Sequence, residues 1–154
     1  MITISSPQNA IQAALVSRLR GDAALAAMIE KVKGQSPPTP AVVDRVPEGQ
    51  PMPYVRVGDH LSTPDNTHTT AGRRVTETLH VWTRERSMGP GQKIATRVGE
   101  LLDHQVAAFD ALLRPNGHKC VSIRLTFDQA LDDPDPEIRH HVLRFTIETA
   151  QAAN

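Results

Sequence analysis

The chain has 154 residues, enough for one domain with a hydrophobic core, and its 17 Lys and Arg residues balance 17 Asp and Glu residues. A protein that neutralises phosphates along a duplex needs an excess of positive charge, so this balance argues against a nucleic-acid-binding protein. One cysteine, Cys120, provides neither an intrachain disulfide nor a cysteine-rich zinc site, and its strand-like surroundings predict a buried thiol. The first residues lack a signal-peptide pattern and no apolar run could span a bilayer, so we expect a soluble protein.

The N-terminal residues predict two helices. Serine is a favoured N-cap and proline a favoured first helical residue, so Ser6 and Pro7 are expected to open the first helix. Gly21 ends it, and Asp22 can cap a second short helix over residues 23–29. The apolar stripe of the first helix comprises Ile11, Ala14, Leu15 and Leu19.

Proline and glycine then interrupt the chain. Residues 33–40 (KGQSPPTP) contain three prolines and a glycine, which predicts a loop or an extended arm. A short strand is expected at 41–46 and a longer one at 54–61, with Val55, Val57 and Leu61 on one face. Residues 62–72 (STPDNTHTTAG) are polar and without periodicity, which predicts a long, mobile hairpin loop.

Residues 73–105 organise the fold. Residues 73–84 alternate with period two, which predicts a strand with Val75, Glu77, Leu79, Val81 and Thr83 on one face. Residues 87–91 (SMGPG) end the strand and predict a turn. The apolar stripe of the helix that follows is Ile94, Val98, Leu101, Leu102 and Phe109, wide enough to lie on a sheet.

The C-terminal third predicts two more strands. Residues 114–117 (RPNG) form a turn, and 121–127 form a strand with Val121, Ile123, Leu125 and Phe127 on one side. An acidic connection at 132–137 leads to the last strand at 139–149. The predicted fold class is α+β: a small, mainly antiparallel sheet with helices packed on it, in the order α-α-β-β-β-α-β-β. We expect one domain over residues 1–154.

Seven histidines invite a metal or catalytic interpretation, but none forms a motif of metal-ligand spacing. They are His60, His68, His80, His104, His118, His140 and His141. Gly89-Pro90-Gly91 before a helix matches no phosphate-binding loop. The carboxylates Asp132, Asp133, Asp135 and Glu137 lack the spacing of a calcium loop, so a solvated turn is favoured. We therefore predict no catalytic residue, no metal ligand and no cofactor.

Trp82, the only tryptophan, lies on the face opposite Val75, Leu79 and Val81. Either a helix covers each side of the sheet or Trp82 belongs to a subunit interface, where tryptophan is enriched. The candidate interface consists of exposed segments and this tryptophan: Ser36, Pro37, Pro38, Thr39, Pro40, Thr63, Asp65, Asn66, Thr67, His68, Thr69 and Trp82.

Several stretches in this order resemble one known family. They are AIQAALVSRLRGDAALAAMI, VVDRVPEGQPMPYVRVGD, TETLHVWTRE, QKIATRVGELLDH and VSIRLTFDQALDDPDPEIRHHVLRFTIET. The chain resembles the tail completion, or tail terminator, proteins of long-tailed phages and gene transfer agents over nearly its whole length. The resemblance implies a non-enzymatic virion protein, assembled in the host cytoplasm and placed at the head–tail junction. It implies a ring, commonly of six subunits, that caps the tail tube.

The implied partners are further copies of the chain, the major tail tube protein, a head-completion or connector protein, and double-stranded DNA that passes through the lumen without sequence recognition. No membrane is implied. Two alternatives from other classes stay open at this point. One is a small metal-binding protein or enzyme that uses the histidines, and the other is a generic protein-binding adaptor.

Overall fold

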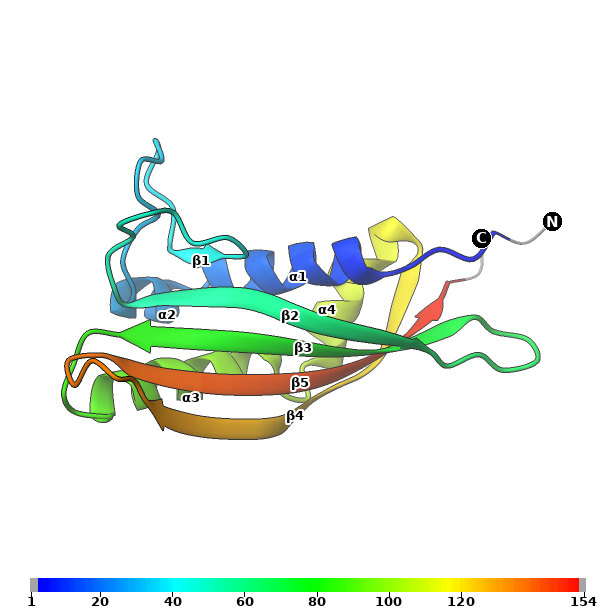
Figure 1. Cartoon of the computed structure of the whole chain (residues 1–154). Coiled ribbons are helices and arrows are strands. Elements are labelled where there is room, and N and C mark those ends of the chain that lie inside the picture. Colours follow the sequence, from blue (N-terminus) through cyan, green and yellow to red (C-terminus); the bar gives the residue numbers. More distant parts are fainter. Residues whose placement is uncertain (1–2, 153–154) are drawn as a thin grey trace.

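The computed structural model describes residues 3–152 and consists of a five-stranded sheet with helices on one face (Figure 1). The strand order is β1-β2-β3-β5-β4; β1 pairs parallel to β2, and the other pairs are antiparallel. The elements in chain order are α1 (Gln8–Arg20), α2 (Ala23–Met28), β1 (Val42–Val43), β2 (Tyr54–Pro64), β3 (Gly72–Thr83), α3 (Gly89–Leu102), α4 (Val106–Leu113), the 3₁₀ helix η1 (Arg114–Asn116), β4 (His118–Asp132) and β5 (Arg139–Gln151). This confirms the predicted α+β class and the mainly antiparallel sheet, with one additional helix, α4.

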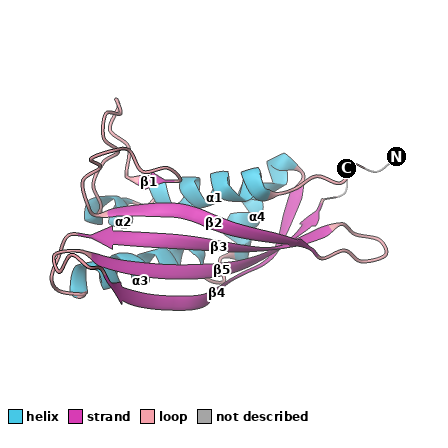
Figure 2. Cartoon of the chain, in the orientation of Figure 1, coloured by secondary structure: helices cyan, strands magenta, loops and turns pink. Residues whose placement is uncertain are grey.

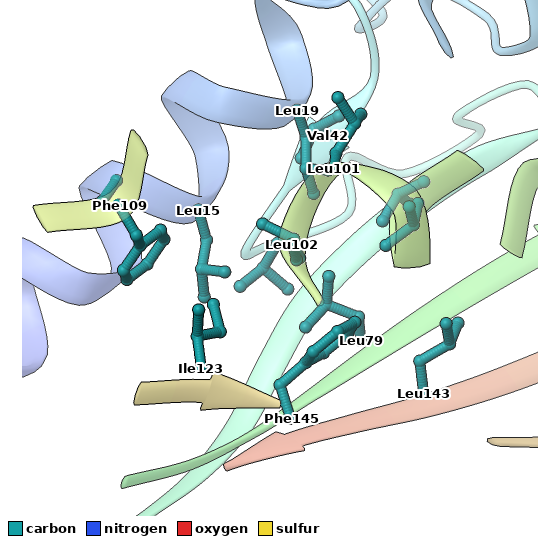
Figure 3. Close-up of a cluster of buried hydrophobic side chains, with 14 of the residues drawn as sticks. Leu15, Leu19, Val42, Leu79, Leu101, Leu102, Phe109, Ile123, Leu143 and Phe145 are labelled. Atoms are coloured by element: carbon teal, nitrogen blue, oxygen red, sulfur yellow. The ribbon is translucent and has the colours of Figure 1, made fainter. Parts of the chain in front are cut away.

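The core lies between the helices and one face of the sheet, as the layered view shows (Figure 2). The alternation predicted for β3 is confirmed, because Val75, Leu79 and Val81 are fully buried on that face. The α3 stripe is buried with them, and Leu102 lies close to Leu79 and Phe145 in the close-up (Figure 3). Burial of these apolar side chains supplies the main stabilisation, at about 25 cal/mol for each Å² removed from water.

The predicted helix boundaries are confirmed in part. The N-cap of α1 is Pro7 without a side-chain cap, because the Ser6 hydroxyl bonds Gln8 instead. The Asp22 cap of α2 is confirmed, since its carboxylate accepts the Leu25 N–H at 2.8 Å. The predicted stripe from residue 94 to Phe109 is split, because α3 ends at Leu102 and Phe109 belongs to α4.

Residues 89–91 form the first turn of α3 rather than a turn before it. Gly91 is buried there, and a Cβ at this position would lie 2.6 Å from Cε1 of His141. Glycine therefore lets the helix approach β5 closely.

Three β-bulges reverse the predicted alternation. In β2 the register shifts between Val57 and His60, which turns Leu61 to the helix-free face with 65% exposure. In β4 it shifts between Cys120 and Ser122 and again between Leu125 and Phe127. Val121 and Phe127 are consequently 51% and 38% exposed, whereas both were predicted to join the core. A bulge places two residues opposite one, so the side chains beyond it change faces.

Other strands also differ in extent. The strand expected at 41–46 is only Val42–Val43, whereas β2 continues to Pro64, and β4 and β5 are longer than predicted. Cys120 is buried, as predicted.

Candidate assembly surfaces

The proline-containing segment between α2 and β1 is a projecting hairpin, called here the arm (residues 31–40; Figure 1). Lys31 pairs with Pro40 across its base, and the Val32 N–H donates to the Thr39 carbonyl at 2.8 Å. The base of the predicted loop is thus an ordered turn. At its tip Ser36, Pro37 and Pro38 are exposed, while Thr39 and Pro40 are half-buried.

One buried side chain holds the arm base. Gln50 accepts the Lys33 N–H at 2.8 Å through Oε1, and its Nε2 donates to the Lys31 carbonyl at 2.9 Å. Sequence reasoning missed Gln50, because nothing in PEGQPMP distinguishes it from other loop residues. A small apolar cluster separate from the main core supports the same region: Val32, Ala41, Val43, Tyr54, Val46, Met52 and Trp82. The arm is therefore fixed at its base and free at its tip.

Trp82 belongs to this arm base. Its ring is half-buried and stacks on the His140 ring, with centroids 3.8 Å apart and planes 7° from parallel. The explanation that a second helix covers this face is wrong, because the helices lie on the other face (Figure 2) and Trp82 packs against the arm base.

The connection between β2 and β3 is shorter than predicted, since β2 ends at Pro64 and β3 begins at Gly72. Thr63 lies in β2, and the β2–β3 loop comprises residues 65–71. Its backbone is braced internally: Asp65 N–H donates to the Gly72 carbonyl at 2.9 Å, and Thr67 N–H to the Thr70 carbonyl at 2.8 Å. The Asn66 side chain accepts the Gly72 N–H at 3.0 Å. Asp65, Asn66, Thr67, His68 and Thr69 are all exposed.

The predicted interface residues therefore form two groups at opposite ends of the sheet (Figure 1). The arm lies beyond the start of β2, and the β2–β3 loop lies beyond its end. Because β2 has 11 residues, these ends are about 33 Å apart at the usual rise of a strand. Trp82 lies with the arm. The residues predicted to form one candidate interface therefore lie on two separate surfaces.

The acidic connection at 132–137 is partly neutralised by arginines. Arg86 pairs with Glu137 at 2.5 Å, Arg84 with Asp135 at 3.8 Å, and Arg139 with Asp132. Exposed pairs of this kind contribute about 0–1 kcal/mol each. The Arg84 and Arg86 pairs tie the β3–α3 connection to the β4–β5 hairpin. Within residues 3–152, no three His, Cys, Asp or Glu side chains are grouped so that they could hold a metal ion.

Two acidic or basic groups lie in the core without partners. Glu77 is 1% exposed, its Oε1 has no hydrogen-bond partner in the described part of the chain, and burial raises its pKa to about 7. His141 is fully buried with both ring nitrogens unpartnered in the same residue range, and burial lowers its pKa. Burial of ionisable groups makes the stability of the fold depend on pH.

Comparison with known proteins places the chain among the structural components of phage-like tails. It belongs to the tail completion protein gp17 family, whose match covers residues 13–150. The tail completion protein gp17 of Bacillus phage SPP1 is 31% identical over 141 residues, which cover 90% of this chain and 92% of that protein.

A solved structure shares the fold. A chain of the virion of a native gene transfer agent particle matches with a TM-score of 0.74 and 24% identity, covering 96% of this chain and 99% of that chain. The match to the gp17 family model and its relative confirms the predicted family, and as a tail completion protein the chain is a virion component. Its family is a structural one and not a known enzyme family. None of the helices in residues 3–152 is long and apolar enough to cross a membrane.

Proposed function

We propose that the protein caps the finished tail tube as a closed ring of identical subunits, a hexamer on family grounds, and forms the tail side of the head–tail junction. The observation that carries the proposal is membership of the tail completion family. The separation of the arm from the β2–β3 loop supports it further. A ring needs a heterologous interface, in which one patch of a subunit meets a different patch of the next.

The arm suits such a contact. Its base is held by Gln50 and the small apolar cluster, so little of its backbone must be ordered when it docks. Proline at three positions restricts the backbone further and reduces the entropy that docking costs. The formal net charge of zero removes strong repulsion between copies, so contacts of modest strength suffice.

The sheet edges are less suited to continuous pairing. β1 pairs with only two residues of β2, and β4 has a partner on one side, so both edges present free backbone groups. Bulges interrupt both edges, a device that discourages strand addition. We therefore assign the subunit contacts to the arm and the β2–β3 loop rather than to edge pairing.

In this proposal the ring contacts the major tail tube protein on one side and a head-completion or connector protein on the other. Double-stranded DNA passes through the lumen without sequence recognition, which agrees with the balanced charge of the chain. The function requires no cofactor.

Removal of the arm tip tests the proposal. Deletion of residues 36–38 is expected to reduce co-sedimentation with tail tubes far more than it lowers the urea midpoint, because these residues are exposed and the base contacts of Thr39 and Pro40 remain. A same-length Gly/Ser replacement of these residues separates loss of side chains from loss of length. Unchanged association of both variants would contradict the assignment of the contact to the arm.

A further inference from the structure

Asn116 and Gly117 form an exposed corner between η1 and β4. Asn116 is the last residue of η1, and Gly117 follows in the left-handed region, with φ 82° and ψ 18°. Both residues are exposed, and a Cβ at Gly117 would meet no atom of residues 3–152 within 4 Å apart from its chain neighbours, so water reaches this corner freely. It is also the only place in the chain where glycine follows asparagine. Neither the family nor the proposed ring uses this pair.

We propose that Asn116 is a site of spontaneous covalent modification, in which water converts its side-chain amide to a carboxyl group. The Gly117 backbone nitrogen gives up its proton and forms a bond to Cγ of Asn116. The bond from Cγ to the amide nitrogen breaks, and that nitrogen leaves as ammonia with the proton, which closes a five-membered succinimide ring. Water then opens the ring at either of its carbonyls, and no group is oxidised or reduced. The product is aspartate or, where the backbone now runs through the former side chain, isoaspartate.

The structure leaves the attacking nitrogen accessible. Gly117 has no side chain that could hinder the approach to its nitrogen. Its N–H donates to the Arg114 carbonyl at 3.0 Å, which closes the single turn of η1. A 3₁₀ turn of three residues has poorer hydrogen-bond geometry than an α-helix and opens readily at an exposed site. Opening of this turn frees the Gly117 nitrogen and lets the Asn116 side chain rotate toward it.

The other asparagines of the described residues are held in place. Asn66 lies in the β2–β3 loop, where its side chain accepts a backbone N–H at 3.0 Å. The nitrogen that would attack it belongs to Thr67 and donates to a carbonyl within the loop at 2.8 Å. Thr67 is also β-branched, so its side chain crowds that nitrogen. Asn9 lies within α1, where the helical backbone fixes its conformation. Asn116 is therefore expected to react first.

Modification at Asn116 affects one end of the sheet. The Gly117 carbonyl accepts the Ala152 N–H at 2.9 Å, and the neighbouring Gln151 N–H donates to the Ala71 carbonyl at 2.7 Å. This second hydrogen bond links the C-terminal end of β5 to the β2–β3 loop. Isoaspartate adds a carbon to the backbone between residues 116 and 117 and so displaces the Gly117 carbonyl. The β2–β3 loop thereby loses part of its support.

The experiment follows the purified full chain during incubation at 37 °C, at pH 7 and at pH 9. Peptide mass spectrometry detects the replacement of an amide by a carboxyl group at each asparagine, and endoproteinase Asp-N, which cuts before aspartate but not before isoaspartate, distinguishes the two products. A synthetic peptide of residues 112–120 is the unfolded reference. Asn116→Gln is the unreactive variant, because its longer side chain closes a ring less readily. Asn9→Gln, at another exposed position, is the matched control.

In the wild type and in Asn9→Gln, we expect residue 116 to become a mixture of aspartate and isoaspartate. The reaction should be faster at pH 9 than at pH 7, because the Gly117 nitrogen must lose its proton. In the wild type, Asn9 and Asn66 should react at least about tenfold more slowly, which corresponds to a barrier higher by at least about 1.4 kcal/mol. Protease cleavage within the β2–β3 loop should become faster in the modified wild type and stay unchanged in incubated Asn116→Gln.

Retention of the amide at residue 116 in the full chain would overturn the proposal, and reaction of the peptide under the same conditions would attribute that result to protection by the fold. Equal rates at Asn116 and Asn66 would also overturn it, and unchanged cleavage of the modified chain would overturn the link to the β2–β3 loop. Urea midpoints establish that both variants are folded. Tube association is not measured, so the result is independent of the proposed ring.

Discussion

A buried carboxyl group makes the stability of this protein depend on pH in a way that one substitution can reveal. Glu77 lies on the core face of β3 between Val75 and Leu79, is 1% exposed, and has no ion-pair partner in the described residues. Burial alone raises its pKa to about 7 from an ordinary 4.5. The substitution Glu77→Gln retains the shape of the side chain and removes its ionisation.

The direction of this pH dependence follows from the unfolded state, in which the Glu77 carboxyl has its ordinary pKa of 4.5. Below that pH both states hold the proton and no stability is lost. Between pH 4.5 and about 7 the unfolded state releases this proton while the folded state keeps it, so the free energy of unfolding falls by about 3 kcal/mol in total, at about 1.4 kcal/mol for each pKa unit, and stays lowered above pH 7. Relaxation of the core around the charge reduces this, so we expect Glu77→Gln to be about 2–3 kcal/mol more stable than the wild type at pH 8 and nearly equal to it at pH 4.5.

Urea unfolding at the two pH values measures this difference. Histidines whose pKa is lowered by burial destabilise the fold as the pH falls below 6.5, but they do so equally in both proteins, so the difference isolates Glu77. They are His80, His118, His140 and His141. Glu85→Gln, at an exposed position, is the control and should show no pH-dependent difference. The same stability difference between Glu77→Gln and the wild type at pH 4.5 and pH 8, or a less stable variant at pH 8, would show that ionisation of Glu77 does not destabilise the fold.

Three further expectations concern packing and the projecting segments. Leu101→Ala should lower the free energy of unfolding, measured in urea, by about 2–5 kcal/mol, because Leu101 is buried in the main core. Val121→Ala should lower it by less than about 1 kcal/mol, because the β4 bulge leaves Val121 exposed. Equal losses in the two variants would contradict the β4 bulge. Gln50→Ala should loosen the arm and weaken tube association, and protease cleavage within residues 31–40 should become faster; unchanged cleavage would show that Gln50 does not hold the arm. In the free chain, limited proteolysis should cut within the β2–β3 loop, residues 65–71, and protection should appear on tube binding. Resistance of this loop in the free chain would count against a role in assembly.

Much of the sheet and its covering helix could be predicted from local pattern. The period-two alternation of β3 and the helical spacing of Ile94, Val98 and Leu101 each determine a face by themselves, and the structure buries both faces together. The family followed from the order of such segments along the chain. These signals are local, so a single sequence contains them in full.

The predictions that were wrong concern places where contacts between residues distant in sequence determine the backbone conformation. The break between α3 and α4 is fixed by β4, because the Ile123 carbonyl accepts the His104 N–H at 2.9 Å and Asp103 accepts the Leu125 N–H at 2.8 Å. The β4 bulges depend on pairing with β5, so the exposure of Val121 could not be read from its alternation. The same reason applies to the arm, whose base depends on hydrogen bonds from a glutamine at least 17 residues away.

In the proposed function, copies of this chain close into a ring at the end of the tail tube. Cryo-electron microscopy of tails assembled with the protein, reconstructed at the tube end without imposed symmetry, tests it most directly. We expect a closed ring of identical subunits, with the arm and the β2–β3 loop of each copy at contacts to a neighbour or to the tube. A single off-axis copy at the tube end, or no copy there, would contradict the terminator function and favour a generic adaptor.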